Sequence, residues 1–119
     1  MGSKYKLVIF VPEANLELLK QALFDAGAGR QGNYDSCSWQ SLGQGQFRPL
    51  EGSAPYLGKQ NQIEQVGEWR LETLVGESLL AAVLEALLET HPYEEPAYDL
   101  ILLSNGFSNG LSVPASEKA

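Results

Sequence analysis

The segment HPYEEPAYDL, residues 91–100, carries the only histidine of the chain together with two adjacent glutamates. A carboxylate beside an imidazole can bring both groups to a pKa near neutrality, so His91 with Glu94 or Glu95 is a candidate general acid/base pair. The same side chains, with Glu64, are the candidate donors for a metal ion, but a protein metal site usually takes three or four ligands. We therefore expect no metal site built from one chain.

The prolines of this segment also support a structural interpretation. Pro92 and Pro96 exclude the helical conformation at His91 and Glu95, which predicts a stiff, extended connector between a helix and a strand. Adjacent side chains of an extended chain point to opposite sides, so one glutamate should face solvent and the other a neighbour such as Arg70. Two interpretations of the segment therefore stay open. It is either a rigid turn with an ion pair, or a contact to a ligand or to a second subunit.

Two further motifs suggest chemistry. GAGRQG, residues 27–32, matches the G-x-G-x-x-G pattern of dinucleotide-binding loops, but that pattern leaves a strand and opens a helix, whereas here it follows a helical sequence. The glycines therefore indicate a helix end and a loop, from which Arg30 could reach an anion. Cys37 has no second cysteine to pair with, and we interpret it as a strand thiol rather than a nucleophile. No cofactor is expected.

Composition excludes several classes of partner. The 119 residues include 8 basic and 15 acidic side chains, and the net charge of −7 repels phosphate backbones and anionic lipid. No apolar run approaches the roughly 20 residues that span a bilayer. We therefore expect a cytoplasmic protein that binds neither nucleic acid nor membrane, and the single cysteine agrees with a reducing compartment. One domain, residues 4–103, and a polar C-terminal tail, residues 104–119, account for the length.

The spacing of apolar residues predicts six secondary-structure elements around these motifs. Alternating or β-branched runs predict strands over 5–12, 33–47, 68–75 and 97–103, the second either continuous or broken at its GQG. Helical spacing predicts helices over 13–27 and 78–90, with Asn15 and Ser78 as N-terminal caps and Gly27 as a C-terminal stop. This β-α-β-β-α-β order is that of an α+β ferredoxin-like sandwich with both helices on one face of an antiparallel sheet.

Four stretches of the chain, in order, resemble a known family: GAGRQGNYDSCSW, GQGQFRPLEGSAPYLG, EQVGEWRLETLV and HPYEEPAYDL. From residue 4 to residue 103 the chain is similar to the domain inserted in the longer, YqfO-type members of the Nif-three-like family. The resemblance implies a ferredoxin-like fold similar to the trimeric CutA and PII-type proteins. Longer members carry a dinuclear metal centre on their flanking halves, which a chain with one histidine cannot rebuild, so the resemblance implies no hydrolase activity here.

What the resemblance implies is a stand-alone, non-enzymatic module for small-ligand binding or regulation, assembled as a homotrimer with clefts between subunits. The shared motifs give the expected ligand-binding residues as Arg30, Asn33, Tyr34, Cys37, Glu64, Arg70, His91, Tyr93, Glu94 and Glu95. The alternatives are a CutA-like divalent-metal tolerance protein and a hydrolase that uses His91 with Glu94 or Glu95. An edge strand within 33–47 should pair with a neighbouring subunit. The 91–96 segment leads into the other expected edge strand, which would place it near a subunit boundary as well.

Overall fold

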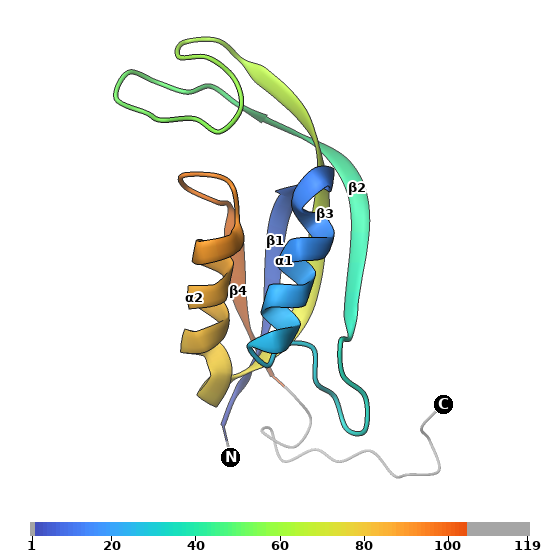
Figure 1. Cartoon of the computed structure of the whole chain (residues 1–119). Coiled ribbons are helices and arrows are strands. Elements are labelled where there is room, and N and C mark those ends of the chain that lie inside the picture. The colour runs from blue at the N-terminus through green and yellow to red at the C-terminus, as the bar shows by residue number, and fades with distance from the viewer. Residues whose placement is uncertain (1, 105–119) are drawn as a thin grey trace.

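The computed structural model describes residues 2–104. Its elements follow in the order β1 (Lys4–Pro12), α1 (Glu13–Asp25), β2 (Ser38–Phe47), β3 (Glu64–Gly76), a short 3-10 helix η1 (Glu77–Leu79), α2 (Leu80–Thr90) and β4 (Tyr98–Leu103). The strands form one antiparallel sheet in the order β2-β3-β1-β4, and both helices cover the same face of it (Figure 1). The predicted α+β ferredoxin-like sandwich is therefore confirmed.

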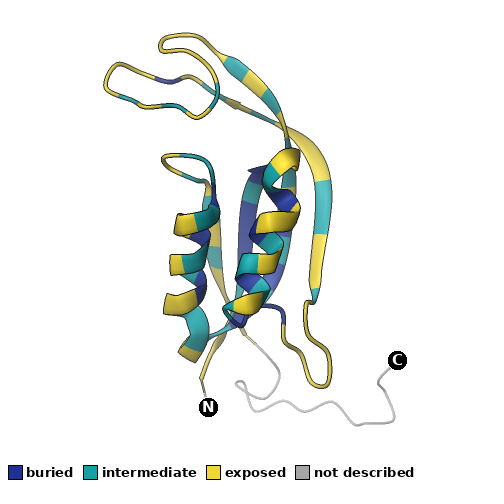
Figure 2. Cartoon of the chain, in the orientation of Figure 1, coloured by how far each residue is buried: buried dark blue, intermediate teal, exposed yellow. Residues whose placement is uncertain are grey.

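The hydrophobic core lies between the sheet and the two helices (Figure 2). Side chains alternate between the faces of a strand, so every second residue of β1 and β3 points to the helices, and helix residues three or four apart meet them. The largest fully buried members of this core are Leu7, Ile9, Val11, Leu19, Leu23, Leu71, Val75, Val83 and Leu87. Burial of each such side chain contributes about 1.5–3 kcal/mol, which fixes the register of β1 between β3 and β4.

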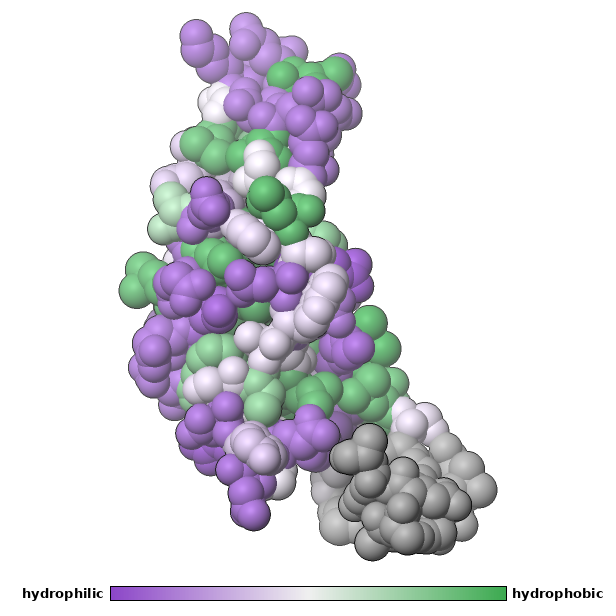
Figure 3. Space-filling model, turned by 90° about the vertical axis from the view of Figure 1, so that its right-hand side faces the viewer, coloured by the Kyte–Doolittle hydropathy of each residue, from purple (hydrophilic) through white to green (hydrophobic). Residues whose placement is uncertain are grey.

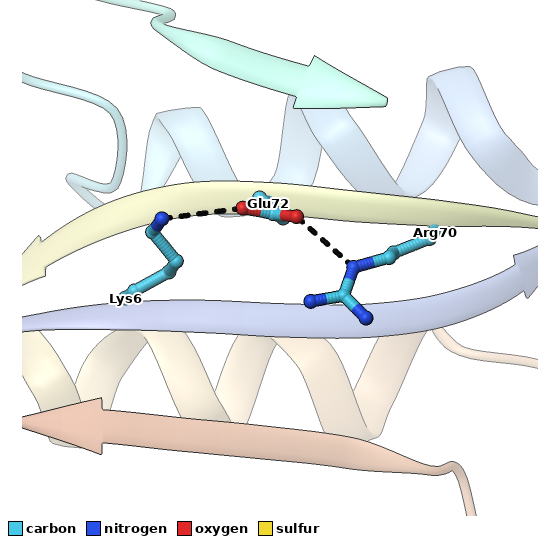
Figure 4. A network of polar contacts seen from close by, with 3 residues as sticks. All are labelled: Lys6, Arg70 and Glu72. Atoms are coloured by element: carbon cyan, nitrogen blue, oxygen red, sulfur yellow. Dashed lines mark hydrogen bonds and ion pairs between the residues drawn. The ribbon is translucent and has the colours of Figure 1, made fainter. Parts of the chain in front are cut away.

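The other face of the sheet carries charged side chains. Glu72 on β3 accepts a hydrogen bond from Arg70 Nε at 3.0 Å and pairs with Lys6 Nζ at 3.3 Å, on the side of the strands away from the helices (Figure 4). The hydrogen bond from Arg70, with Lys6 beside it, lowers the pKa of the Glu72 carboxyl. The Arg70 guanidinium also lies 5.8 Å from the centre of the Phe10 ring. These contacts fix the side chain of Arg70 on the sheet.

The helices begin differently from the prediction. α1 starts at Glu13 directly after Pro12, so Asn15 lies inside the first turn and makes no cap. Ser78 lies within η1, ahead of α2, and neither helix has a side-chain cap at its N-terminus. The two predicted caps are therefore wrong. The predicted stop is confirmed, because Gly27 has a φ of +112°, a conformation that favours glycine.

β2 and β3 form a long hairpin that rises beyond the helices and ends in a loop over residues 48–63 (Figure 1). The predicted strand over 33–47 begins only at Ser38, because a turn precedes it, and it continues through both glycines of GQG. A Cβ at Gly45 would overlap the Glu68 carboxylate, so this glycine provides the space for that side chain. Within residues 2–104, no helix is both long and apolar enough to cross a membrane. The predicted C-terminal tail, apart from Ser104, lies outside the described residues.

Candidate functional site

The 48–63 loop folds against the segment between α2 and β4, residues 91–97, which we call the connector. Together with the adjoining ends of β2 and β3 they line an open cavity of about 250 Å³. Three aromatic rings, Phe47, Tyr56 and Tyr93, and three glutamates, Glu68, Glu94 and Glu95, line it. We call this site the aromatic cavity. It combines apolar walls with a few charged groups, as small-molecule sites do.

Hydrogen bonds hold the loop in place over the connector. The Glu94 carboxylate accepts a hydrogen bond from the Ala54 backbone N–H at 3.1 Å, which joins the two segments directly. Within the loop, Ser53 Oγ donates to the Leu50 carbonyl at 2.6 Å, and Gln60 Nε2 donates to the Ser53 carbonyl at 3.0 Å. The loop therefore satisfies several of its own polar groups and forms a defined wall of the cavity.

The connector is bent, not extended as predicted. Residues 92–95 form a continuous bend, and both Glu94 and Glu95 line the cavity instead of pointing to opposite sides. The expected pairing of one of them with Arg70 is also wrong, since the carboxylate beside Arg70 is that of Glu72. The prolines fix the connector as a turn that directs two adjacent carboxylates to one place.

His91 connects this turn to the core. It is 6% exposed, its Nε2 lies 2.7 Å from the Phe10 carbonyl oxygen, and its Nδ1 accepts a hydrogen bond from the Tyr93 N–H at 3.1 Å. An accepting Nδ1 leaves the proton on Nε2, which donates to the carbonyl. Burial lowers the pKa of the imidazole, so the neutral ring is favoured. Both ring nitrogens are used within the fold, and neither is free for a substrate proton or a metal ion.

Tyr93 is the central residue of the cavity wall. Its ring centre lies 5.9 Å from that of Phe47, 6.2 Å from that of Tyr56 and 5.0 Å from that of His91, and the rings are inclined by about 50°. Burial, and then the Glu68 carboxylate, raise the pKa of the Tyr93 phenol, so the hydroxyl keeps its proton. That hydroxyl is buried beside the Glu68 carboxylate, and its geometry there falls short of a well-formed hydrogen bond.

The residues expected to bind a ligand lie in three places. His91, Tyr93, Glu94 and Glu95 belong to the connector, and Glu64 begins β3 beside the 48–63 loop. Arg70 lies on the charged face of the sheet. The others, Arg30, Asn33, Tyr34 and Cys37, lie in the turn that leads into β2, at the opposite end of that strand from the cavity. One chain therefore does not bring all ten residues together.

The turn before β2 has a structural explanation of its own. Gly29 has a φ of +81°, and a Cβ there would lie 2.9 Å from the Cys37 backbone nitrogen. Gly29 donates a hydrogen bond to the Leu74 carbonyl at 2.8 Å and accepts one from the Cys37 N–H at 2.8 Å, while Thr73 Oγ1 donates to the Cys37 carbonyl. The glycine-rich motif thus attaches the turn to β3. Arg30, Asn33 and Tyr34 are exposed beside it.

Sequence reasoning missed several residues that line the aromatic cavity, among them Phe47, Tyr56 and Glu68. Tyr56 stands in a loop sequence with two prolines, and nothing in that sequence indicates which strand end the loop covers. Glu68 alternates with Trp69 and Leu71 in sequence, a pattern that indicates an exposed side chain on a half-buried strand. Gly45, two residues before Phe47, was the available sequence signal for this part of the site. A glycine inside a strand often marks the close approach of another group.

Metal ligands do not gather in the described part of the chain. Among residues 2–104, no group of three or more histidine, cysteine, aspartate or glutamate side chains is placed to hold one ion. Glu94 and Glu95 are adjacent, but the only histidine near them uses both of its nitrogens.

Comparison with known proteins identifies the chain. A relative from Halalkalibacterium halodurans, named GTP cyclohydrolase 1 type 2 homolog, is 48% identical over 103 residues, which cover 87% of this chain and 28% of the relative. The solved structure of a Bacillus cereus protein related to NIF3 is 43% identical with a TM-score of 0.76, over 87% of this chain and 26% of that one. The chain is a domain of the Nif-three-like family. It spans about a quarter of the length of these relatives, and no protein-family model matches it.

The fold of this Nif-three-like domain is also found in smaller proteins. The periplasmic divalent cation tolerance protein CutA from Archaeoglobus fulgidus has a TM-score of 0.63 at 18% identity, over 91% of both chains. GlnK from Bacillus subtilis has a TM-score of 0.57 at 19% identity, over 86% of both chains. These likenesses confirm the CutA- and PII-like architecture.

Proposed function

We propose that this Nif-three-like domain is a non-enzymatic module that binds a small ligand or regulates a partner, and that it assembles as a homotrimer with ligand clefts near the subunit boundaries. The observation that carries the proposal is the aromatic cavity. A preformed pocket of about 250 Å³, with aromatic walls and convergent polar groups, is the ordinary form of a small-molecule site. The loop that covers it is tied to the connector by the Glu94 carboxylate.

The arrangement of His91 favours binding over hydrolysis. A general acid/base pair needs a ring nitrogen within hydrogen-bond reach of the substrate, and both nitrogens of His91 are engaged with Phe10 and Tyr93. The Glu94 carboxylate is engaged with Ala54. His91 and Glu94 therefore stabilise the turn, and their engaged atoms give the hydrolase alternative no support.

The edges of the sheet support assembly. β2 and β4 each have one side without a strand neighbour in the described chain, and exposed edges pair readily with another chain. Trp39 and Leu42 on β2 are 59% and 63% exposed, and Leu102 on β4 is 62% exposed. The side of the molecule that carries β2 shows hydrophobic residues among polar ones (Figure 3). The number of subunits, three, is carried over from the resemblance to trimeric CutA and PII-type proteins.

Light scattering coupled to size exclusion tests the assembly. We expect a mass about three times the 13.0 kDa of the chain. Reversal of two charges in the connector, Glu94→Lys with Glu95→Lys, should weaken the trimer. The matched control, Glu85→Lys with Glu89→Lys, changes the same charge on exposed residues of α2 and should leave the mass unchanged. A monomer at micromolar concentration would refute the trimer and the position of the clefts.

A further inference from the structure

The charged groups around the aromatic cavity are nearly all of one sign. Three carboxylates line the cavity, and among the described residues no lysine or arginine lines it. The segments that enclose it, residues 46–68 and 91–97, contain five glutamates against one arginine and one lysine. A pocket with this field attracts cations and repels carboxylates and phosphates.

The aromatic walls fit the same kind of ligand. Phe47 and Tyr56 meet Tyr93 at interplanar angles of 54° and 49° rather than stacking on it, and all three residues line the cavity. The negative face of an aromatic ring attracts a cation within about 6 Å of its centre, and such cages are suited to alkylammonium groups. A metal ion, in contrast, would need several oxygen or nitrogen donors in one shell, which the described residues do not provide.

Tyr93 and Glu68 add a polar end to the cavity. The buried Tyr93 hydroxyl lies close to the Glu68 carboxylate without a well-formed hydrogen bond to it. The Glu68 carboxylate lies near this hydroxyl and occupies the space left by Gly45. A cation in the cavity would therefore face a polar end formed by Glu68 and Tyr93.

We propose that the aromatic cavity binds a small organic cation, with an alkylammonium group between the rings of Phe47, Tyr56 and Tyr93 and its charge balanced by Glu68. This inference rests on the proposed function, because it specifies the ligand class of the same site. A volume of about 250 Å³ is slightly below the roughly 300–1,000 Å³ of drug-sized pockets, so a molecule of the size of choline fits the space.

Choline and its neutral isostere 3,3-dimethylbutan-1-ol test the charge requirement, because they share shape and differ in the ammonium group. Each is titrated into the isotopically labelled protein while the backbone amide signals of Ala54 and Tyr93 are followed. We expect saturable shifts with choline and weaker binding of the isostere by at least about tenfold. Acetate and inorganic phosphate, added in the same way, should leave both signals in place.

Two pairs of variants locate the site. Tyr56→Ala should weaken choline binding about three- to thirtyfold, whereas Leu50→Ala, in the same loop and similarly exposed, should not. Glu68→Gln should weaken it about tenfold, whereas Glu51→Gln, at an exposed loop position, should not. Tyr56 is 52% exposed, so its replacement leaves the fold intact and the comparison stays interpretable.

The outcomes separate this inference from the function on which it rests. Equal affinity for choline and the isostere, or no response to choline while acetate or phosphate shifts the same amides, refutes the organic cation and leaves a ligand-binding module. No response to any probe, together with no small molecule released when purified protein is denatured, refutes both. Charge-dependent binding that Tyr56→Ala and Glu68→Gln weaken, and their controls do not, supports both.

Discussion

Replacement of His91 by glutamine should remove a specific part of the pH dependence of stability. The imidazole is buried and neutral in the folded protein, and burial lowers its pKa below the usual value of about 6.5. In the unfolded chain the ring takes up a proton near that usual value. Below about pH 6.5 the unfolded state therefore binds more protons than the folded state, and stability must fall as the pH decreases until the folded-state pKa is reached.

The magnitude is bounded because the chain has a single histidine. One titrating group changes the free energy of unfolding by at most about 1.36 kcal/mol per pH unit. Glutamine cannot titrate, so His91→Gln should show a flatter profile over this window. The variant should also be less stable at neutral pH by about 1–3 kcal/mol, because the Phe10 carbonyl or the Tyr93 N–H loses its partner.

Urea unfolding of both proteins between about pH 5 and pH 8, at one fixed protein concentration, measures the difference. Carboxylates and the N-terminal amine are common to the two proteins, so subtraction of the profiles isolates the histidine. Parallel profiles across this range would show that His91 is not kept neutral by burial. The assignment of both ring nitrogens to Phe10 and Tyr93 would then be wrong.

Two further comparisons test the turn before β2 and the charged face. Gly29→Ala should lower the free energy of unfolding by about 2–4 kcal/mol, because its Cβ would meet the Cys37 backbone. Gly32 also has a positive φ but has open space around it, so Gly32→Ala should cost only about 1 kcal/mol. Equal losses for the two variants in urea unfolding would contradict the steric explanation. Arg70→Lys should lower the free energy of unfolding by about 0.5–1 kcal/mol, because lysine lacks the planar guanidinium that contacts Glu72. Lys59→Ala in the exposed loop should change it by less than about 0.5 kcal/mol. Equal melting temperatures for both variants and the parent would contradict the ion pair.

The sequence predicts the fold well because the core follows simple periods. Alternation puts Leu71 and Val75 on one side of β3, and four-residue spacing puts Val83 and Leu87 on one side of α2. All four side chains are buried in the core. Gly27 marked the helix end because few other residues adopt its backbone conformation. Rules that depend only on the residues of one segment were sufficient to predict these elements.

The candidate site was only partly predictable, because its walls come from segments far apart in the sequence. The connector motif identified Tyr93, Glu94 and Glu95, but Phe47 and Tyr56 become neighbours of Tyr93 only when the 48–63 loop folds back. The helix caps failed for a different reason. Pro12 leads directly from β1 into α1, so Asn15 lies inside the helix instead of at its start. Ser78, the residue expected to cap α2, lies within η1.

Native mass spectrometry of the protein purified from its own host tests the central claim most directly, because it reports subunit number and retained small molecules together. The account predicts an assembly of about three times the 13.0 kDa chain mass that carries an organic molecule, which Tyr56→Ala releases. A monomer without a bound molecule would contradict it. A trimer that retains only a stoichiometric metal ion would contradict the ligand and favour the metal-tolerance alternative.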